Sequence, residues 1–375
     1  MVQDSTSVND NVDPFMGTAD HGHVYPGATV PFGMVQLSPD NGTQGWDWCS
    51  GYNYVDSVIV GFSHTHLSGT GIGDLADISV MPYVGTADLS RQGNDHKAED
   101  FASLFSHANE EASPGYYSVM LEKNNVLAEL TATERVGVHR YTFQAGQTPS
   151  MIINLAFAIN WDAPVSASVE MESDTVITGH RHSRGWARDQ RLFYAIEFSE
   201  SISDMRSFVD GAESGSDNVR GVKIKSQLTF AEGTEQITMK VGISTASVEG
   251  AKAAIRNEVG DKSFDQIRVE ASEAWEGNLS RVTSKSYTSE YDRVFTTSLY
   301  RTMLAPIVYS DAQGSYKGAD SAYHTTATDR YDIFSLWDTF RAANPLLTIT
   351  QPERIDDIVN SLLMHYDEYG LLPVW

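Results

Sequence analysis

The sequence predicts a multidomain protein in which an N-terminal antiparallel β-sandwich is followed by helices. Short runs of alternating or β-branched residues fill most of residues 12–250. The hydrophobic period then changes from about two to about 3.6, as expected where strands give way to helices. Because 375 residues exceed the usual size of one hydrophobic core, more than one domain is expected.

The first domain is predicted to be a β-sandwich spanning residues 1–250. Its strand-like runs include "HRYTF", "SMIINLAF", "RLFYAIEFS", "GVKIKSQLTF" and "EQITMKVGIST", separated by turn-forming stretches such as "AEGTE". Many short strands with frequent turns are typical of a large antiparallel sandwich. The turn-rich stretch 209–219 is predicted to be a surface loop.

Helices are predicted after the sandwich, with a helical linker at 251–285 and the start of a helical domain at 286–375. One helix begins near Ser289, and a loop rich in Gly and Asp, "SDAQGSYKGAD", follows it. The face of this helix that we expect to pack consists of Tyr291, Val294, Phe295, Ser298, Leu299 and Thr302.

The last predicted helix is bounded by Pro352, which suits a first helical turn, and by Gly370, which suits a stop. Its buried face is expected to consist of Ile355, Ile358, Val359, Leu362, Leu363 and Tyr366. The apolar segment "LLPVW" then ends the sequence at Trp375 and is typical of the beginning of another packed element. We therefore expect the helical domain to continue beyond this residue.

The net charge of the chain argues against nucleic acids and anionic membrane surfaces as binding partners. Fifty acidic and 26 basic side chains give a formal net charge of -24, which repels nucleic-acid phosphates and anionic headgroups. No apolar run approaches the roughly 20 residues of a membrane span, so no membrane insertion is expected. Cys49 is the only cysteine, which excludes an internal disulfide. Since no leader is visible, the protein is either cytoplasmic, or periplasmic or secreted with its leader removed.

Two His-x-His pairs, His21 with His23 and His64 with His66, place imidazoles two residues apart. In a strand both rings of a pair would lie on one face, as a metal site needs. Together with the aspartates of "GIGDLADI", a His/Asp metal centre is one alternative. Hydrogen-bonding histidines in a polar pocket are the other, and this alternative is favoured because the motif is short.

Tryptophan stands beside aspartate at Trp46–Asp47 and again at Trp337–Asp338. An indole can cover the apolar face of a sugar while the carboxylate accepts hydrogen bonds from its hydroxyls. Arg341 lies three residues after Asp338, where it can join such a site or form an ordinary helix ion pair. Core packing or a solvated surface remains the alternative for each pair.

Long motifs extend this interpretation: "VDPFMGT", "HGHVYPGATVPFGMVQLSPD", "GFSHTHLSGTG", "ELTATERVGVHRYTF" and "FSLWDTFRAANPLLTITQPER". They closely resemble glycoside hydrolase family 92, the calcium-dependent exo-acting α-mannosidases, many of which cleave α-1,2 links. The resemblance runs from about Asn11 to Trp375 in order and without large gaps.

The resemblance implies a β-sandwich joined through helices to an (α/α)6 toroid, of which this chain holds only the first helices. It also implies inversion, in which an acid protonates the leaving oxygen and a carboxylate roughly 6.5 to 9.5 Å away activates water. Ca2+ would grip the sugar hydroxyls. In the family the acid, the base and most calcium ligands lie beyond the segment that ends here at Trp375, so no catalytic or metal-ligating residue is assigned and the 375 residues alone are expected to be inactive.

The resemblance also implies which residues bind substrate, and mannose-containing glycans are the expected partners. The implied substrate-binding residues are Asp338, Trp337 and Arg341 at the hydroxyls of the terminal mannose, Gly17, Thr18, Trp46 and Asp47 along the pocket, and His64 and His66 either in the same wall or in the core.

Two other functions remain open at this point. One is a non-catalytic carbohydrate-binding or interface module, for which Trp46, Trp48 and Trp186 would serve equally well. The other is a sandwich metalloenzyme that uses the two histidine pairs. The sequence leaves open the linkage preference, the natural glycan and the oligomeric state.

Overall fold

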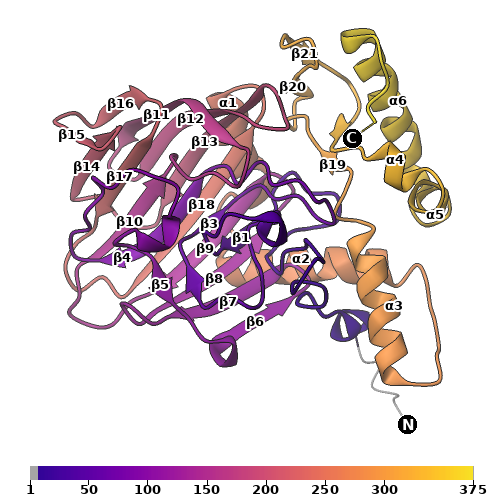
Figure 1. Ribbon diagram of the computed structural model, residues 1–375, viewed down its shortest axis with the longest axis horizontal. Coiled ribbons are helices and arrows are strands. Elements are labelled where there is room, and N and C mark those ends of the chain that lie inside the picture. The colour runs from indigo at the N-terminus through magenta and orange to yellow at the C-terminus, as the bar shows by residue number, and fades with distance from the viewer. Residues whose placement is uncertain (1–6, 375) are drawn as a thin grey trace.

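Two antiparallel β-sheets form the N-terminal part of the protein in the computed structural model, which describes residues 7–374 (Figure 1). The seven-stranded sheet has the order β1 (Ser38–Asp40), β3 (Gly61–Ser63), β4 (Ser79–Val84), β10 (Pro149–Asn154), β17 (Ile224–Thr229), β14 (Asp204–Val209) and β15 (Ala212–Ser214). The nine-stranded sheet has the order β16 (Asn218–Gly221), β11 (Ala163–Ser173), β12 (Val176–Arg184), β13 (Gln190–Phe198), β18 (Gln236–Ser244), β9 (Val136–Thr142), β8 (Val126–Ala132), β7 (Tyr116–Leu121) and β6 (Glu110–Ser113).

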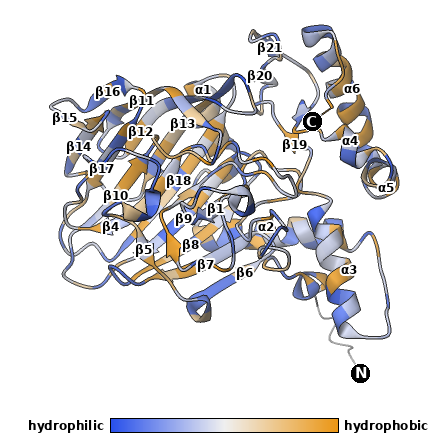
Figure 2. Cartoon of the chain, in the orientation of Figure 1, coloured by the Kyte–Doolittle hydropathy of each residue, from blue (hydrophilic) through white to orange (hydrophobic). Residues whose placement is uncertain are grey.

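Both sheets contribute to one hydrophobic core. Leu130 of β8 and Leu228 of β17, from different sheets, are fully buried members of it. Figure 2 shows apolar residues along the central strands of both sheets. The five strand-like runs found in the sequence lie in β9, β10, β13, β17 and β18, so the predicted N-terminal sheet domain is confirmed.

Within residues 7–374, three pairs of short strands lie outside the two sheets, and there are four short 3-10 helices. The pairs are β2 (Val58–Ile59) with β5 (Ser103–Leu104), β19 (Ile307–Val308) with β22 (Tyr331–Asp332), and β20 (Ser315–Lys317) with β21 (Tyr323–Thr325). The 3-10 helices are η1 (Val8–Asn11), η2 (Trp46–Trp48), η3 (His96–Ala98) and η4 (His107–Asn109).

Helices follow the last strand of the nine-stranded sheet, as predicted (Figure 1). They are α1 (Val248–Ala254), the π-helical turn η5 (Ile255–Val259), α2 (Phe264–Leu279), α3 (Ser289–Arg301), α4 (Leu336–Thr339), α5 (Ala343–Thr350) and α6 (Pro352–Tyr369). A capping box, in which Ser263 and Gln266 satisfy each other's backbone N–H groups, starts α2. Ile255 and Ile267 pack with Val138 of β9, so this helical segment covers the outer face of the nine-stranded sheet.

A second hydrophobic core joins the N-terminal segment to the helices. Trp275 of α2 is fully buried, its ring centroid lies 4.3 Å from that of Tyr300 of α3, and its indole N–H donates to the backbone oxygen of Thr29 at 2.7 Å. Leu347 of α5 and Phe334 belong to the same core. The residues that precede β1 thus hold the helices against the sandwich.

The helix α6 begins and ends as predicted. Pro352 occupies the first helical turn, and Gly370 ends the helix with a left-handed φ of 83°. Its predicted buried face is only partly correct: Ile355, Ile358 and Leu362 are half-buried against the second core, whereas Val359, Leu363 and Tyr366 are exposed. The face predicted for α3 is correct at Leu299, which is buried, but wrong at four exposed residues, Tyr291, Val294, Phe295 and Ser298. Thr296, Thr297 and Tyr300 pack inward in their place.

Two loops predicted from turn-forming residues contain strands. The stretch 209–219 includes β15 and the first residues of β16, which pair with β14 and β11. The Gly- and Asp-rich stretch 310–320 contains β20, which pairs with β21. These strands could not be predicted from local composition, because pairing with neighbouring strands stabilises them rather than their own residue types. Among the described residues, no helix combines the length and apolar character that a membrane crossing requires.

Candidate functional site

A cavity of about 750 Å³ lies where the sandwich meets the C-terminal segment. Its sandwich side is formed by loop residues such as Thr70, Asp74 and Trp186. Its helical side includes Ser335, just before α4, and Val374, beyond α6. A cavity of this size lies within the roughly 300 to 1,000 Å³ typical of small-molecule sites.

The HGH motif and the first tryptophan pair converge beside this cavity. The Nδ1 atom of His21 lies 2.6 Å from Oδ1 of Asp47, and Nε2 of His23 lies 3.9 Å from the same oxygen. The indole of Trp46 packs on both imidazoles, with ring centroids 4.8 Å from His21 and 4.3 Å from His23. Burial lowers the pKa of His23, against the opposing effect of Asp47.

The indole of Trp46 packs against Gly71, whose neighbours line the cavity. A Cβ atom at Gly71 would lie 2.7 Å from the indole Nε1, so only glycine lets the chain pass under the ring. The flanking residues Thr70 and Ile72 line the cavity. Trp46 itself remains 55% exposed, so part of its indole is accessible to a ligand.

Gly17 and Thr18 support the HGH loop. A Cβ atom at Gly22 would lie 1.7 Å from the backbone oxygen of Gly17, so the two backbones touch at a point that no side chain can occupy. Thr18 is buried, and its hydroxyl donates to the backbone oxygen of Phe15 at 2.8 Å. In the structure these predicted pocket residues therefore lie behind the HGH loop.

The second predicted group lies on α4, across the cavity from the sandwich loops. Asp338 is exposed, and Ser335 donates its hydroxyl to Oδ2 of Asp338 at 2.6 Å. Trp337 is exposed and donates its backbone N–H to the oxygen of Val374 at 3.2 Å. Arg341 lies over the ring of Phe340 and forms no ion pair with Asp338 in the described part of the chain.

The structure separates the two histidine pairs. His64 and His66 are buried inside the sandwich, away from His21 and His23. One ring nitrogen of His66 lies 2.7 Å from the backbone oxygen of Gln36 and the other lies 3.0 Å from Oδ1 of Asp40. His66 thus binds its own loop and strand residues on both sides of the ring.

The aspartates of "GIGDLADI" do not join either histidine pair. Asp77 binds Arg181 of β12, which is fully buried and also binds Asp162, each at 2.5 Å. Breaking one partner of such a buried pair is strongly destabilising, so this cluster holds three segments of the sandwich together under the cavity.

Asp74 is a buried carboxyl in the cavity lining, and its burial is not evident from the sequence. It is 3% exposed, lines the cavity, and accepts a hydrogen bond from the backbone N–H of Ala187 at 2.6 Å. Burial raises the pKa of its carboxyl to about 6. Trp186, which precedes Ala187, stacks on Trp161 with their ring centroids 6.5 Å apart. The burial of Asp74 and its proximity to Trp186 could not be predicted from the sequence, because no local pattern indicates either.

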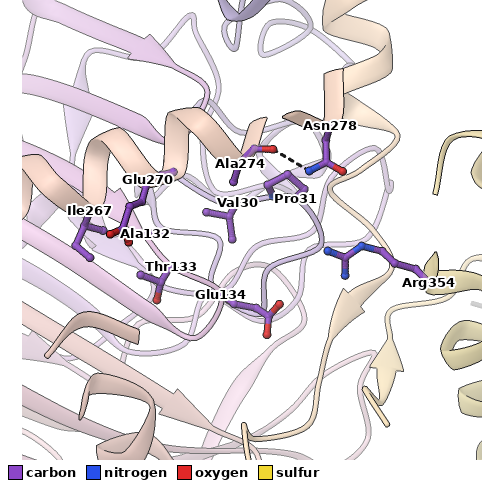
Figure 3. A pocket seen from close by; sticks show the side chains of 11 residues that line it. Val30, Pro31, Ala132, Thr133, Glu134, Ile267, Glu270, Ala274, Asn278 and Arg354 are labelled. Atoms are coloured by element: carbon purple, nitrogen blue, oxygen red, sulfur yellow. Dashed lines mark hydrogen bonds between the residues drawn. The ribbon is translucent and has the colours of Figure 1, made fainter. Parts of the chain in front are cut away.

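A smaller pocket of about 230 Å³ lies under α2, where Figure 3 shows Glu134 and Arg354 from different segments pointing toward it. Asn278 donates its side-chain amide to the backbone oxygen of Ala274 at its rim. Burial raises the pKa of Glu134, while Arg135 opposes the shift. None of the predicted substrate-binding residues is in the lining of this pocket or of the large cavity, so Trp46 and Asp338 adjoin the large cavity only through their neighbours.

Chemically, the large cavity offers aromatic faces, carboxylates and backbone groups on walls from both halves of the chain, as recognition of a polyhydroxylated ligand requires. Comparison with known proteins agrees with that character. Residues 11–244 match the Glycosyl hydrolase family 92 N-terminal domain, and residues 250–375 match the Glycosyl hydrolase family 92 catalytic domain.

Three relatives share the fold or the sequence over most of this chain. The family GH92 α-mannosidase BT3965 from Bacteroides thetaiotaomicron, in complex with mannoimidazole, is 32% identical with a TM-score of 0.93 over 99% of this chain and 50% of that chain. The inverting mannosidase BT2199 from the same organism is 29% identical with a TM-score of 0.85 over 100% of this chain and 50% of its own. An uncharacterized secreted glycosidase from Arthroderma benhamiae is 25% identical over 357 residues, 88% of this chain and 45% of the relative. The chain thus spans about half the length of the relatives it matches.

Proposed function

Because this chain belongs to glycosyl hydrolase family 92, we propose that it forms the sandwich and the first helical part of an exo-acting α-mannosidase that removes terminal mannose from glycans. Two solved relatives are mannosidases, and one of them is an inverting enzyme. Inversion, a preference for α-1,2 links and completion of the helices into an (α/α)6 toroid belong to the same proposal. Secretion is supported by the description of the Arthroderma relative.

The cavity between the two halves is the observation that carries this proposal. Its lining includes Thr70 and Ile72, which flank Gly71 beside the indole of Trp46. Its lining also includes Ser335, which donates a hydrogen bond to Asp338. These contacts with lining residues support the assignment of Trp46 and Asp338 to substrate binding. In the proposed complex, Trp46 covers the apolar face of the mannose, and Asp338 accepts hydrogen bonds from its hydroxyls. Exclusion of water from this space would strengthen both contacts.

The Ca2+ expected from the resemblance does not fit the described residues. Calcium takes six to eight oxygen ligands at about 2.3 to 2.6 Å. Within residues 7–374, the group of metal-binding side chains brought closest together is His21, His23 and Asp47, which offers two nitrogens and one carboxylate. Calcium dependence therefore stays a proposal for the whole protein, and no catalytic step is assigned to the ion here. The acid and the base are likewise proposed to lie beyond Trp375.

Release of mannose from α-1,2-mannobiose tests the proposal. The whole protein should release mannose, EGTA should suppress the release, and residues 1–375 alone should release none. In the whole protein, Asp338→Ala should lower kcat/KM about 10- to 100-fold, the effect of losing hydrogen bonds to a charged group. The melting temperature should change little, because Asp338 is exposed and its described contact is one hydrogen bond from half-buried Ser335.

Asp367→Ala, which removes an exposed carboxylate from α6, is the matched control and should leave kcat/KM unchanged. Binding of mannobiose without hydrolysis by the whole protein would replace the enzyme by a carbohydrate-binding module. The exposed stack of Trp161 on Trp186 gives that second function its own support.

A further inference from the structure

We propose that His21, His23 and Asp47 bind a divalent transition-metal ion, with Zn2+ as the preferred ion. One ligand atom from each side chain lies within 4.8 Å of the other two. These are the ligand types that zinc takes from proteins, and three protein ligands with an open fourth position are the usual arrangement of a reactive zinc site. The inference rests on this geometry and not on the proposed mannosidase activity.

His23 provides the strongest indication of a ligand. Its side chain is 5% exposed, and its Nε2 atom has no hydrogen-bond partner within the described residues, although it points toward Asp47. A buried polar atom without a partner costs free energy unless something occupies the space beside it.

The backbone brings the two histidines together in an unusual way. His23 has a positive φ of 51°, which is uncommon for a residue other than glycine. Gly22 between the histidines lies so close to the oxygen of Gly17 that no other residue fits there. Two donors hold the backbone oxygen of His23: the N–H of Gly69 at 2.7 Å and the hydroxyl of Ser50. The rings therefore converge because the loop is fixed on several sides.

Asn53 ties the third ligand to this loop. Its side-chain amide donates to the backbone oxygen of Asp47 at 3.1 Å and to that of Asp20 at 3.4 Å. The Asp47 carboxylate and the HGH loop, 26 residues apart at His21, are thereby held side by side. Trp46 covers both imidazoles, which shields one side of the site from water.

The distances suit an ion of the size of zinc after a small adjustment. Metal-to-ligand distances of about 2.0 to 2.1 Å place the ligand atoms of a tetrahedral site about 3.4 Å apart. The 2.6 Å contact between His21 and Asp47 must lengthen, and the 3.9 Å separation of His23 from Asp47 must shorten. Since the side chain of His21 is 69% exposed, it can rotate to make this change. Two imidazoles also favour zinc over calcium, which prefers oxygen ligands.

Equilibrium dialysis of the tag-free 375-residue chain against Zn2+, followed by elemental analysis, tests the site. We expect one equivalent of zinc to be retained in the presence of a thousandfold excess of Ca2+. Substitution with Co2+ should give the intense visible absorption of a tetrahedral site. His21→Ala and Asp47→Asn should each weaken zinc binding at least tenfold, because each removes a direct ligand.

The matched control is His324→Ala, because His324 also pairs with an aspartate, at 3.0 Å from Asp320, but belongs to no group of three metal-binding side chains within residues 7–374. It should retain the zinc. Equal retention in His21→Ala, loss of zinc in His324→Ala, displacement by Ca2+, or no retention by the unaltered chain would each overturn the proposal. His21 is exposed, so His21→Ala should fold, and an unchanged melting temperature of the metal-free variant checks this.

Discussion

The Nε2 atoms of His64 and His139 lie 3.0 Å apart and join the two sheets, with both side chains fully buried. Nδ1 of His64 faces the backbone oxygen of Ile78 at 2.7 Å and must carry a proton, so Nε2 of His64 accepts and Nε2 of His139 donates. Nδ1 of His139 then accepts from the hydroxyl of Tyr141 at 2.8 Å. The hydrogen bonds run in one direction, and burial lowers the pKa of both imidazoles, which stay neutral.

Tyr141→Phe should lower the free energy of unfolding by about 1 to 3 kcal/mol, because it leaves Nδ1 of His139 buried without a donor. Urea unfolding at pH 7.5 measures the change. Tyr287→Phe removes the hydroxyl of a fully exposed tyrosine and should have no effect. Equal stability of the two variants would show that the chain of hydrogen bonds contributes nothing.

Asp74→Asn should stabilise the protein at pH 7.5 and have little effect near pH 4. The folded-state pKa of Asp74, about 6, lies above its ordinary value of 3.8, so the folded state holds the proton more tightly than the unfolded chain does. Ionisation of Asp74 therefore lowers the free energy of unfolding of the wild-type protein as the pH rises from about 4 to about 6. The loss is at most about 3 kcal/mol above pH 6. Melting temperatures across pH 4 to 8 measure the difference between the variants. An unchanged difference at every pH, as expected for the exposed control Asp204→Asn, would contradict the raised pKa.

Trp46→Ala in the whole protein should raise KM for α-1,2-mannobiose about tenfold, since the sugar loses the aromatic face that covers it. Trp46→Phe, which keeps a smaller ring over the same place, should give an intermediate KM. The rates at a range of substrate concentrations separate KM from kcat. If KM stays at the wild-type value in both variants, Trp46 does not contact the sugar.

Leu362→Ala and Leu363→Ala form a matched pair on α6. Leu362 is half-buried against the second core, and its truncation should cost about 1 to 3 kcal/mol, less than for a fully buried leucine. Leu363 is 55% exposed, and its truncation should change stability by no more than about 0.5 kcal/mol. Urea unfolding of both variants makes the comparison, and a larger effect at Leu363 would reverse the assigned packing face.

Local patterns predicted the long strands and helices because these elements carry their own signals. Alternation marks a strand such as β18, and Pro352 with Gly370 marks both ends of α6. The short strand β15 carries no such signal, since "AES" is stabilised by pairing with β14 and not by its own composition. The packing face of α3 is also not predictable from periodicity, because the polar residues Thr296 and Thr297 are buried and Thr297 accepts a hydrogen bond from the distant backbone N–H of Asp13.

The candidate site was predictable in its residue types but not in its grouping. The sequence predicts Trp46 with Asp47 as a sugar-binding pair, and it offers His21 with His23 as a possible metal-binding pair. Their meeting depends on Asn53, whose spacing to either loop has no recognisable pattern. Likewise, both rings of the "SHTH" motif are buried, and only the folded chain shows which partners surround them.

The guanidinium of Arg181 has a mechanical consequence. Two carboxylates from separate segments, Asp77 and Asp162, both pair with this one buried cation. Separating either segment from Arg181 would leave a buried charge unpaired, so the sandwich side of the cavity is expected to be rigid. A ligand that enters or leaves would then have to displace the opposite wall, where Leu371, Leu372 and Val374 are exposed and Ser335 is half-buried.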